Sequence, residues 1–305
     1  MIVTHVELFP DIFVVTSGAF PFCNSVVILN DENAIVDPGC SLEHLRALLR
    51  TRALDLKDID VVLLSHIHPD HITHAARIQR FSQCRIAANE ITAPLFDDKE
   101  KMKQFLGFVL SNPVRSQWED LVNRWMSGCL DKGRVDEIVK DNEKIGIGEL
   151  SMRMVYTPGH LPDHMCVELI EPNLLFTADI DCTEFGPYYG HPSSSISEFK
   201  KSIEIISQNQ YNGIISGHLK QPLIREYSSA LAAYSRQIDT REDLVLAAIM
   251  DGKTSVEEVA RTPIIYPNHP NPVFLQFEIW MVEHHVSSLI QRGLVERKRE
   301  RLRAI

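Results

Sequence analysis

The feature that most constrains this chain is a dense group of metal-ligand residues at the end of an apolar run. The run Val61-Val62-Leu63-Leu64 is typical of a strand buried on both faces, and after Ser65 it continues as His66-Ile67-His68-Pro69-Asp70-His71. Alternate residues of an extended segment point the same way, so His66 and His68 can reach one ion, and Asp70 and His71 lie on the following turn. Unpaired buried imidazoles and carboxylates cost free energy, which disfavours a purely structural role. The segment therefore predicts a metal site.

Three later segments repeat this pattern of an apolar strand followed by a turn with a potential ligand. They place His160 after Val155-Tyr156-Thr157-Pro158-Gly159, Asp179 after Leu175-Phe176-Thr177-Ala178, and His218 after Ile214-Ile215-Ser216-Gly217. With the first group they supply five histidines and two aspartates, which we expect to gather at one edge of a sheet. Imidazole and carboxylate ligands suit zinc, iron, manganese and similar ions.

These motifs, in this order, resemble those of the metallo-β-lactamase superfamily. The matching residues are H-x-H-x-D-H at 66–71, T-P-G-H at 157–160, the aspartate at 179 and G-H at 217–218. The resemblance covers roughly residues 3 to 220. It implies an α/β fold, an αββα four-layer sandwich of two mixed sheets with external helices, with the metal site along one edge.

The resemblance also implies two adjacent metal sites. In it, His66, His68 and His160 hold the first ion, and Asp70, His71 and His218 hold the second. Asp179 bridges the two ions together with a water or hydroxide. The implied cofactors are two divalent ions, with zinc as first choice and iron or manganese as alternatives. Asp70 is also the expected catalytic residue, orienting the nucleophile or moving a proton.

Four further residues are candidates for contact with substrate or for support of the ligands. His164 lies four residues after His160 and resembles a second histidine in relatives with thioester or sulfur chemistry. Asp37 matches the early D-x-G turn of the superfamily, where it orients a ligand. Tyr188 and Tyr189 lie in a loop that the resemblance places close to the site, where either could contact substrate.

The chain divides into two expected domains. Residues 1–222 form the metallo-β-lactamase-like domain, and its charged stretch at about 89–145 is interpreted as a helical insertion that covers the site. Residues 223–305 are expected to be helical, with candidate helices at Leu244 to Met250, Ser255 to Ala260 and Phe274 to Ile290, followed by Gly293 and a short strand. This order resembles a winged-helix domain.

The composition of the chain limits which kinds of partner and which cellular location we expect for it. A net charge of -10 argues against a protein that mainly binds nucleic acid, although six of the last 15 residues are basic. No apolar stretch approaches the roughly 18 residues of a membrane span. No secretory signal is visible at the start, so the expected location is cytoplasmic, with six reduced cysteines. Whether the chain forms a homo-oligomer stays open.

The leading hypothesis is a metal-dependent hydrolase that uses a metal-bridging hydroxide on a small ester or thioester, as glyoxalase II relatives do. Three alternatives stay open. They are a phosphodiester or RNA hydrolase, an iron-dependent dioxygenase of sulfur compounds, and a non-catalytic metal-containing regulatory protein.

Overall fold

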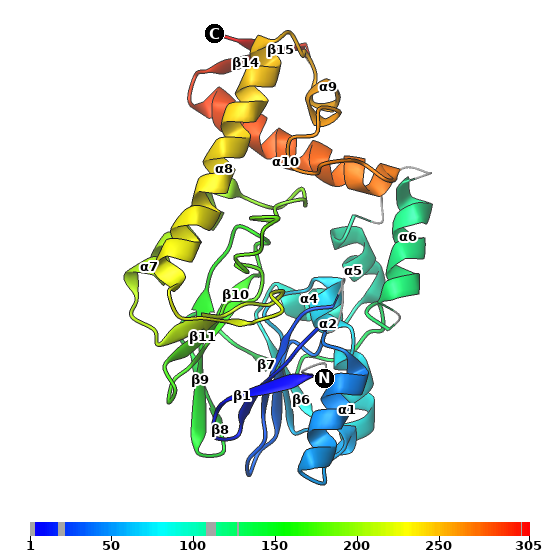
Figure 1. Ribbon diagram of the computed structural model, residues 1–305. Coiled ribbons are helices and arrows are strands. Elements are labelled where there is room, and N and C mark those ends of the chain that lie inside the picture. Colours follow the sequence, from blue (N-terminus) through cyan, green and yellow to red (C-terminus); the bar gives the residue numbers. More distant parts are fainter. Residues whose placement is uncertain (1–3, 18–21, 108–113, 127, 300) are drawn as a thin grey trace.

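The computed structural model describes residues 4–17, 22–107, 114–126, 128–299 and 301–305 (Figure 1). Its first sheet has seven strands in sequence order, antiparallel from β1 to β4 and parallel from β4 to β7. The strands are β1 (His5–Phe9), β2 (Ile12–Val15), β3 (Ser25–Ile28), β4 (Ala34–Val36), β5 (Val61–Leu63), β6 (Arg85–Ala88) and β7 (Glu137–Ile138). The expected buried strand is therefore β5, at an interior position of this sheet.

The second sheet has six strands in the order β13-β12-β11-β10-β9-β8. They are β8 (Lys144–Ile147), β9 (Leu150–Tyr156), β10 (Met165–Leu169), β11 (Leu174–Phe176), β12 (Gly213–Ile215) and β13 (Leu223–Ile224). β11 and β12 are parallel and the other pairs are antiparallel, so this sheet is also mixed.

Each sheet packs against the other sheet with one face and against helices with its opposite face. Val14 of β2 and Phe176 of β11 belong to one apolar cluster between the sheets. Val15 faces the other way, toward α1 (Leu42–Thr51) and α3 (Ala75–Ser82). Leu175 likewise faces α7 (Ile196–Gln208) and α8 (Tyr227–Met250). Alternate residues of a strand point to opposite faces, and burying both faces gives the four layers expected from the sequence.

The helical insertion is shorter than predicted. Helices occupy α4 (Thr92–Phe96), α5 (Lys99–Phe105) and α6 (Val114–Trp125), but residues 137–138 and 144–147 are strands β7 and β8. The prediction of helix up to about residue 145 was wrong at this end. β7 has only two residues and depends on pairing with β6, so it leaves no periodic pattern in the sequence. β8 does alternate, with Ile145 and Ile147 buried.

The C-terminal part contains α8, α9 (Val256–Ala260), α10 (Pro272–Gln291) and a hairpin of β14 (Val295–Lys298) and β15 (Arg301–Ala304). The expected helix at 244–250 is the last part of the 24-residue α8. Figure 1 shows α8 leading away from the sandwich, and α10 beginning near α6 and running from there toward the C-terminal hairpin. No helix in the described part of the chain is long and apolar enough to cross a membrane.

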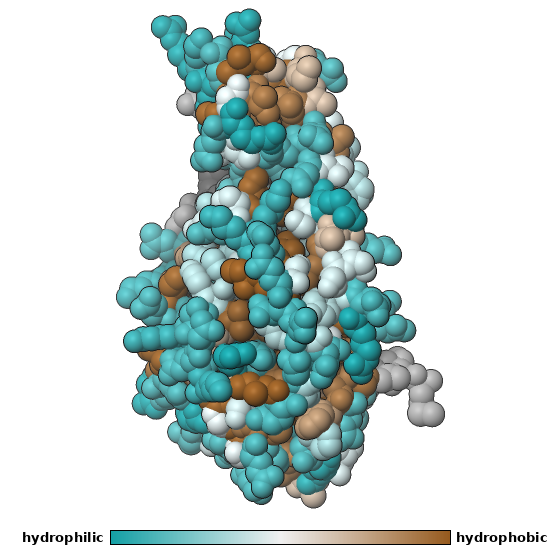
Figure 2. Space-filling model, turned by 90° about the vertical axis from the view of Figure 1, so that its left-hand side faces the viewer, coloured by the Kyte–Doolittle hydropathy of each residue, from teal (hydrophilic) through white to brown (hydrophobic). Residues whose placement is uncertain are grey.

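The face of the molecule shown in Figure 2 carries mostly hydrophilic residues. Hydrophobic residues reach that surface in small separate areas between them. Isolated apolar surface residues are ordinary for a folded protein and mark no binding face there.

Candidate metal centre

The predicted ligands follow strands of both sheets and meet at one edge of the sandwich. The segment from His66 to His71 comes after β5, and the turn with His160 comes after β9. Asp179 follows β11, and His218 follows β12. The structure therefore brings together all seven residues that the sequence singled out, within two adjacent groups.

The first group contains His66, His68, His160 and Asp179, each offering one donor atom within 4.8 Å of the others. Nε2 of His160 lies 2.7 Å from Nδ1 of His68 and 3.0 Å from Oδ2 of Asp179. Nε2 of His66 is 3.8 Å from the same oxygen. Three imidazole nitrogens thus converge on one carboxylate oxygen.

The second group contains Asp70, His71 and His218. Oδ2 of Asp70 lies 3.7 Å from Nε2 of His71 and 3.6 Å from Nε2 of His218. Oδ1 of Asp179 lies 2.7 Å and 3.1 Å from the same two nitrogens. The two oxygens of Asp179 therefore face different groups.

The charged groups of the site strongly shift one another's pKa values. Burial acts to raise the pKa of Asp179, but the imidazoles around it, His71 first, hold that pKa well below its usual range. Burial acts to lower the pKa of His218, but the carboxylate of Asp179 outweighs it and raises the pKa to about 9. Concentrated negative charge next to imidazole nitrogens is the environment that favours a bound cation.

The donor set fits divalent metal ions. Nε2 of His66 is buried and has no hydrogen-bond partner within the described residues, which is costly for a polar atom. Imidazole nitrogens and carboxylate oxygens are ligands that zinc, iron and manganese accept. A cation at each group would satisfy these atoms and offset the carboxylate charge.

Hydrogen bonds behind the ligands fix their orientation. The Asp37 carboxylate accepts from the backbone N–H of Ser65 at 2.7 Å and from Nδ1 of His71 at 2.7 Å. Nδ1 of His160 donates to the backbone carbonyl of Tyr188 at 2.8 Å. A further constraint is Gly39, where a Cβ would lie 1.6 Å from the carbonyl oxygen of Asp70. The turn that carries Asp70 therefore needs glycine at position 39.

His164 lies behind the ligands and not among them. Its Nδ1 is 2.9 Å from the carbonyl oxygen of Thr157 and donates to it, and its Nε2 accepts from the backbone N–H of Asp179 at 3.2 Å. Burial lowers the pKa of His164 to about 3. A neutral His164 thus positions the backbone of Asp179.

The two tyrosines have different surroundings. Tyr188 lines the cavity beside the ligands. Tyr189 is fully buried, and its hydroxyl lies 2.8 Å from Nε2 of His285 and 3.3 Å from the guanidinium of Arg241. The Tyr189 side chain packs into the protein, and Tyr188 is the one of the two that faces the cavity and stays a candidate for contact with substrate.

Sequence reasoning missed two supporting residues. The carboxylate of Asp163 accepts from the backbone N–H of Ile67, between two ligands, and from the hydroxyl of Thr92, both at 2.8 Å. Burial raises the pKa of Asp163 to about 6. The other is Arg241 of α8, which donates to the carbonyl oxygens of Phe185 and Pro187. Asp163 lies inside the ligand loop, which is a usable signal, whereas Arg241 has no local signal in the sequence.

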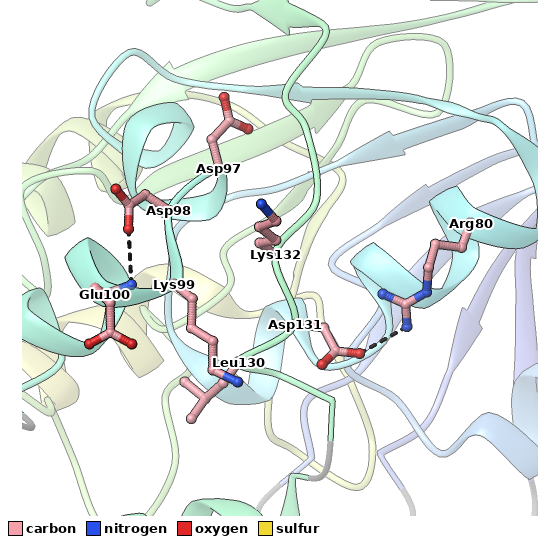
Figure 3. Close-up of a pocket in the computed structure, with 8 residues that line it drawn as sticks. All are labelled: Arg80, Asp97, Asp98, Lys99, Glu100, Leu130, Asp131 and Lys132. Atoms are coloured by element: carbon pink, nitrogen blue, oxygen red, sulfur yellow. Dashed lines mark hydrogen bonds and ion pairs between the residues drawn. The ribbon is translucent and has the colours of Figure 1, made fainter.

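A cavity of about 420 Å³ adjoins the ligands, with His68, Asp70, Asp179 and His218 in its wall. The rest of the wall comes from the loop at 181–191, from α6 and from α10. A second hollow, on the surface, lies among charged residues of α3, α5 and the segment 130–132 (Figure 3). There Arg80 pairs with Asp131 at 2.8 Å, and the hollow shares no residue with the metal-ligand groups.

A two-layered β core flanked by helices, with seven histidine and aspartate donors at one edge, defines a metallohydrolase-type fold and site. The sequence pattern of the metallo-beta-lactamase superfamily matches residues 18–218, and the chain belongs to that superfamily.

Curated relatives are distant. The chain is 24% identical over 188 residues to a metallo-beta-lactamase fold-containing protein of Sulfurisphaera tokodaii, covering 56% of this chain and 69% of that protein. It is 21% identical over 201 residues to the acyl-coenzyme A thioesterase MBLAC2 of Gallus gallus, covering 62% and 69%. An atrochrysone carboxyl ACP thioesterase of Aspergillus fumigatus is 28% identical over 126 residues, covering 41% of this chain and 28% of that protein.

Solved structures show the same fold over nearly the whole chain. A metallo-beta-lactamase family protein from Thermus thermophilus superposes with a TM-score of 0.77 at 17% identity, covering 98% of this chain and all of that one. A beta-lactamase domain protein from Burkholderia ambifaria gives 0.74 at 17% identity, covering 99% and 93%. The C-terminal helices are therefore within the shared fold.

Proposed function

We propose that the protein hydrolyses a small thioester or ester with two divalent cations, zinc as first choice. The observation that carries the proposal is the position of Asp179, whose two oxygens face two separate groups of ligand atoms. In the proposed assignment His66, His68 and His160 would hold one cation, and Asp70, His71 and His218 would hold the other. Asp179 would serve both. The cations would lower the pKa of a shared water and stabilise negative charge on the substrate carbonyl oxygen.

The chain's own residues supply orientation and proton transfer. Asp37 and the Tyr188 carbonyl each accept from one Nδ1–H, so His71 and His160 present Nε2 to the site. Asp70 reaches the cavity with its carboxylate, where it can accept a proton from the attacking water. Two thioesterases among the relatives support thioesters over other acyl compounds.

The experiment is a metal analysis followed by an activity screen on the full chain. Protein purified without added metal or chelator is analysed by mass spectrometry, and we expect about two zinc ions per chain. The metal-loaded protein is then assayed with a thioester, an oxygen ester and bis(p-nitrophenyl) phosphate. Turnover of the phosphodiester alone, or one iron per chain with no hydrolysis, would overturn the proposal.

A further inference from the structure

The cavity beside the ligands has a largely apolar wall that is rich in aromatic side chains. Trp118 of α6, Phe277 and Trp280 of α10, and Phe185, Tyr188 and Tyr266 line it. Its volume of about 420 Å³ is within the range of small-molecule sites, about 300–1,000 Å³. A wall of this kind binds apolar groups, because it removes their surface from water.

The rings of the wall are arranged around Phe277. Its centroid lies 5.4 Å from that of Trp118 and 6.0 Å from those of Tyr188 and Trp280. Nε1 of Trp118 donates to the carbonyl oxygen of Leu106 at 3.1 Å, so this indole N–H is directed at the backbone. Phe277 therefore has a central place in the wall, and it joins the surface of α10 to that of α6.

Away from the candidate metal ligands, the described wall of the cavity offers no positive side chain to pair with an anion. Among the described residues that line it there are three carboxylates, Asp70, Asp179 and Asp181, and no lysine or arginine. Arg241 lies over the rings of Phe185 and Tyr189, and its donors are directed at backbone carbonyls. A carboxylate or phosphate buried against α10 would thus be unpaired, at a cost of several kcal/mol.

We propose that the substrate's acyl group occupies this cavity, and that it is an uncharged apolar chain or ring. This inference rests on the proposed hydrolase function. Thiol carriers are polar, so in a thioester the acyl portion is the part that matches an apolar wall. Water adds to the carbonyl carbon, the C–O bond forms, the C–S bond breaks, and the proton goes to the thiolate. Acyl groups ending in a carboxylate are excluded.

The test compares two substrates that differ only in charge at the far end. Octanoyl and 7-carboxyheptanoyl thioesters of N-acetylcysteamine are assayed with the metal-loaded protein. We expect kcat/KM to be at least about 100-fold higher for octanoyl, since burying an unpaired carboxylate costs several kcal/mol. Equal values, or a preference for the carboxylate, would overturn the proposal.

The preference of the cavity for uncharged groups can also be tested by a binding measurement, which does not require hydrolysis. Trp118 and Trp280 line the cavity, so their fluorescence reports occupancy. Octanamide should change the emission at concentrations where 7-carboxyheptanamide has no effect. If octanamide binds and no thioester is hydrolysed, the hydrolase function fails while the cavity's selectivity stands. If neither compound binds, or both bind alike, the selectivity fails.

Two variants on α10 test whether the preference for octanoyl depends on the cavity wall. Phe277→Lys puts a cation into the wall and should reduce the octanoyl preference at least tenfold. Gln276→Lys adds the same charge at the neighbouring residue, which does not line the cavity, and should leave the preference unchanged. Phe277→Ala is the companion if the lysine variant does not fold. It should lower kcat/KM for octanoyl much more than for acetyl, and equal losses for both would contradict the proposal.

Discussion

The carboxylate of Asp37 orients two imidazoles of the metal centre at once. It accepts directly from Nδ1 of His71 and also from the hydroxyl of Ser65, at 2.7 Å and 2.5 Å. Because that hydroxyl donates to Asp37, its oxygen is left to accept from Nδ1 of His66, 2.8 Å away. Both rings then keep Nε2 free of hydrogen, which is the form that binds a metal.

Replacing Asp37 should therefore weaken metal binding without removing a ligand. In Asp37→Asn the single amide oxygen cannot accept both from the Ser65 backbone N–H on one side and from His71 and the Ser65 hydroxyl on the other. We expect the affinity for at least one ion to fall about 10- to 100-fold. Competition with a chromophoric chelator measures it. Asp55→Asn, which makes the same change at the cap of a surface turn at 56–58, is the matched control. Equal affinities in all three proteins would refute the role of Asp37.

The position of Asp179 between the two groups predicts a change in stoichiometry. Asp179→Ala removes the oxygens that face both groups, and His66→Ala removes one nitrogen of the first group. Each variant should bind at least one ion fewer per chain than the wild type, by mass spectrometry of the purified protein. His44→Ala, a histidine outside both groups, should keep the wild-type content. Unchanged metal content in the variants would contradict the assignment.

Arg241 connects α8 to the loop that orients His160. Its guanidinium holds the carbonyl oxygens of Phe185 and Pro187, and the next residue, Tyr188, supplies the carbonyl that accepts from His160. Arg241→Met leaves buried acceptors unpaired, so we expect a loss of about 2–4 kcal/mol in the free energy of unfolding. A shifted loop should also weaken the first metal site.

Two further variants separate positioning from stability. Arg241→Lys can still donate to one carbonyl and should recover part of the metal affinity. Arg236→Met, at an exposed residue of the same helix, should match the wild type. Metal affinity that stays at the wild-type value in folded Arg241→Met would show that the arginine acts on stability alone.

His191 predicts how stability depends on pH. Its Nε2 donates to the carbonyl oxygen of Phe105, and His284 donates to the backbone carbonyl of His191. Burial lowers the pKa of His191 from 6.5 to about 4. Between these values the unfolded chain binds more protons, so this contribution to stability is complete above pH 6.5 and is lost as pH falls toward 4.

The corresponding measurement is urea unfolding of the wild type and of His191→Asn at pH 7.5 and pH 5. The asparagine cannot titrate. From pH 7.5 to pH 5 the free energy of unfolding should therefore fall by about 2 kcal/mol more in the wild type than in the variant. The difference between the two proteins isolates His191 from other groups that titrate. If the difference in unfolding free energy between the two proteins is the same at both pH values, His191 is protonated equally in the folded and unfolded states.

The gathering of the seven candidate ligands could be predicted from sequence because they follow short apolar strands, and strand ends at one edge meet in space. The sequence could not tell Tyr188 from Tyr189, because loop residues carry no periodic pattern that shows which side chain faces the cavity. The early part of α8 was missed since it mixes alanine and serine with buried polar residues such as Arg241 and Glu242. The role of Phe277 depends on where α10 packs, which no local pattern encodes.

The side of the cavity that α10 forms and the candidate metal ligands belong to different parts of the chain. A chain ending after β13 at residue 224 would contain every ligand but none of α10, and so would lack the wall around Phe277. Conversely, substitutions along α10 alter the shape offered to a substrate while leaving the seven donors in place. If the proposed function holds, a change of acyl group would require changes on α10 only, and the residues that would hold the cations could stay the same.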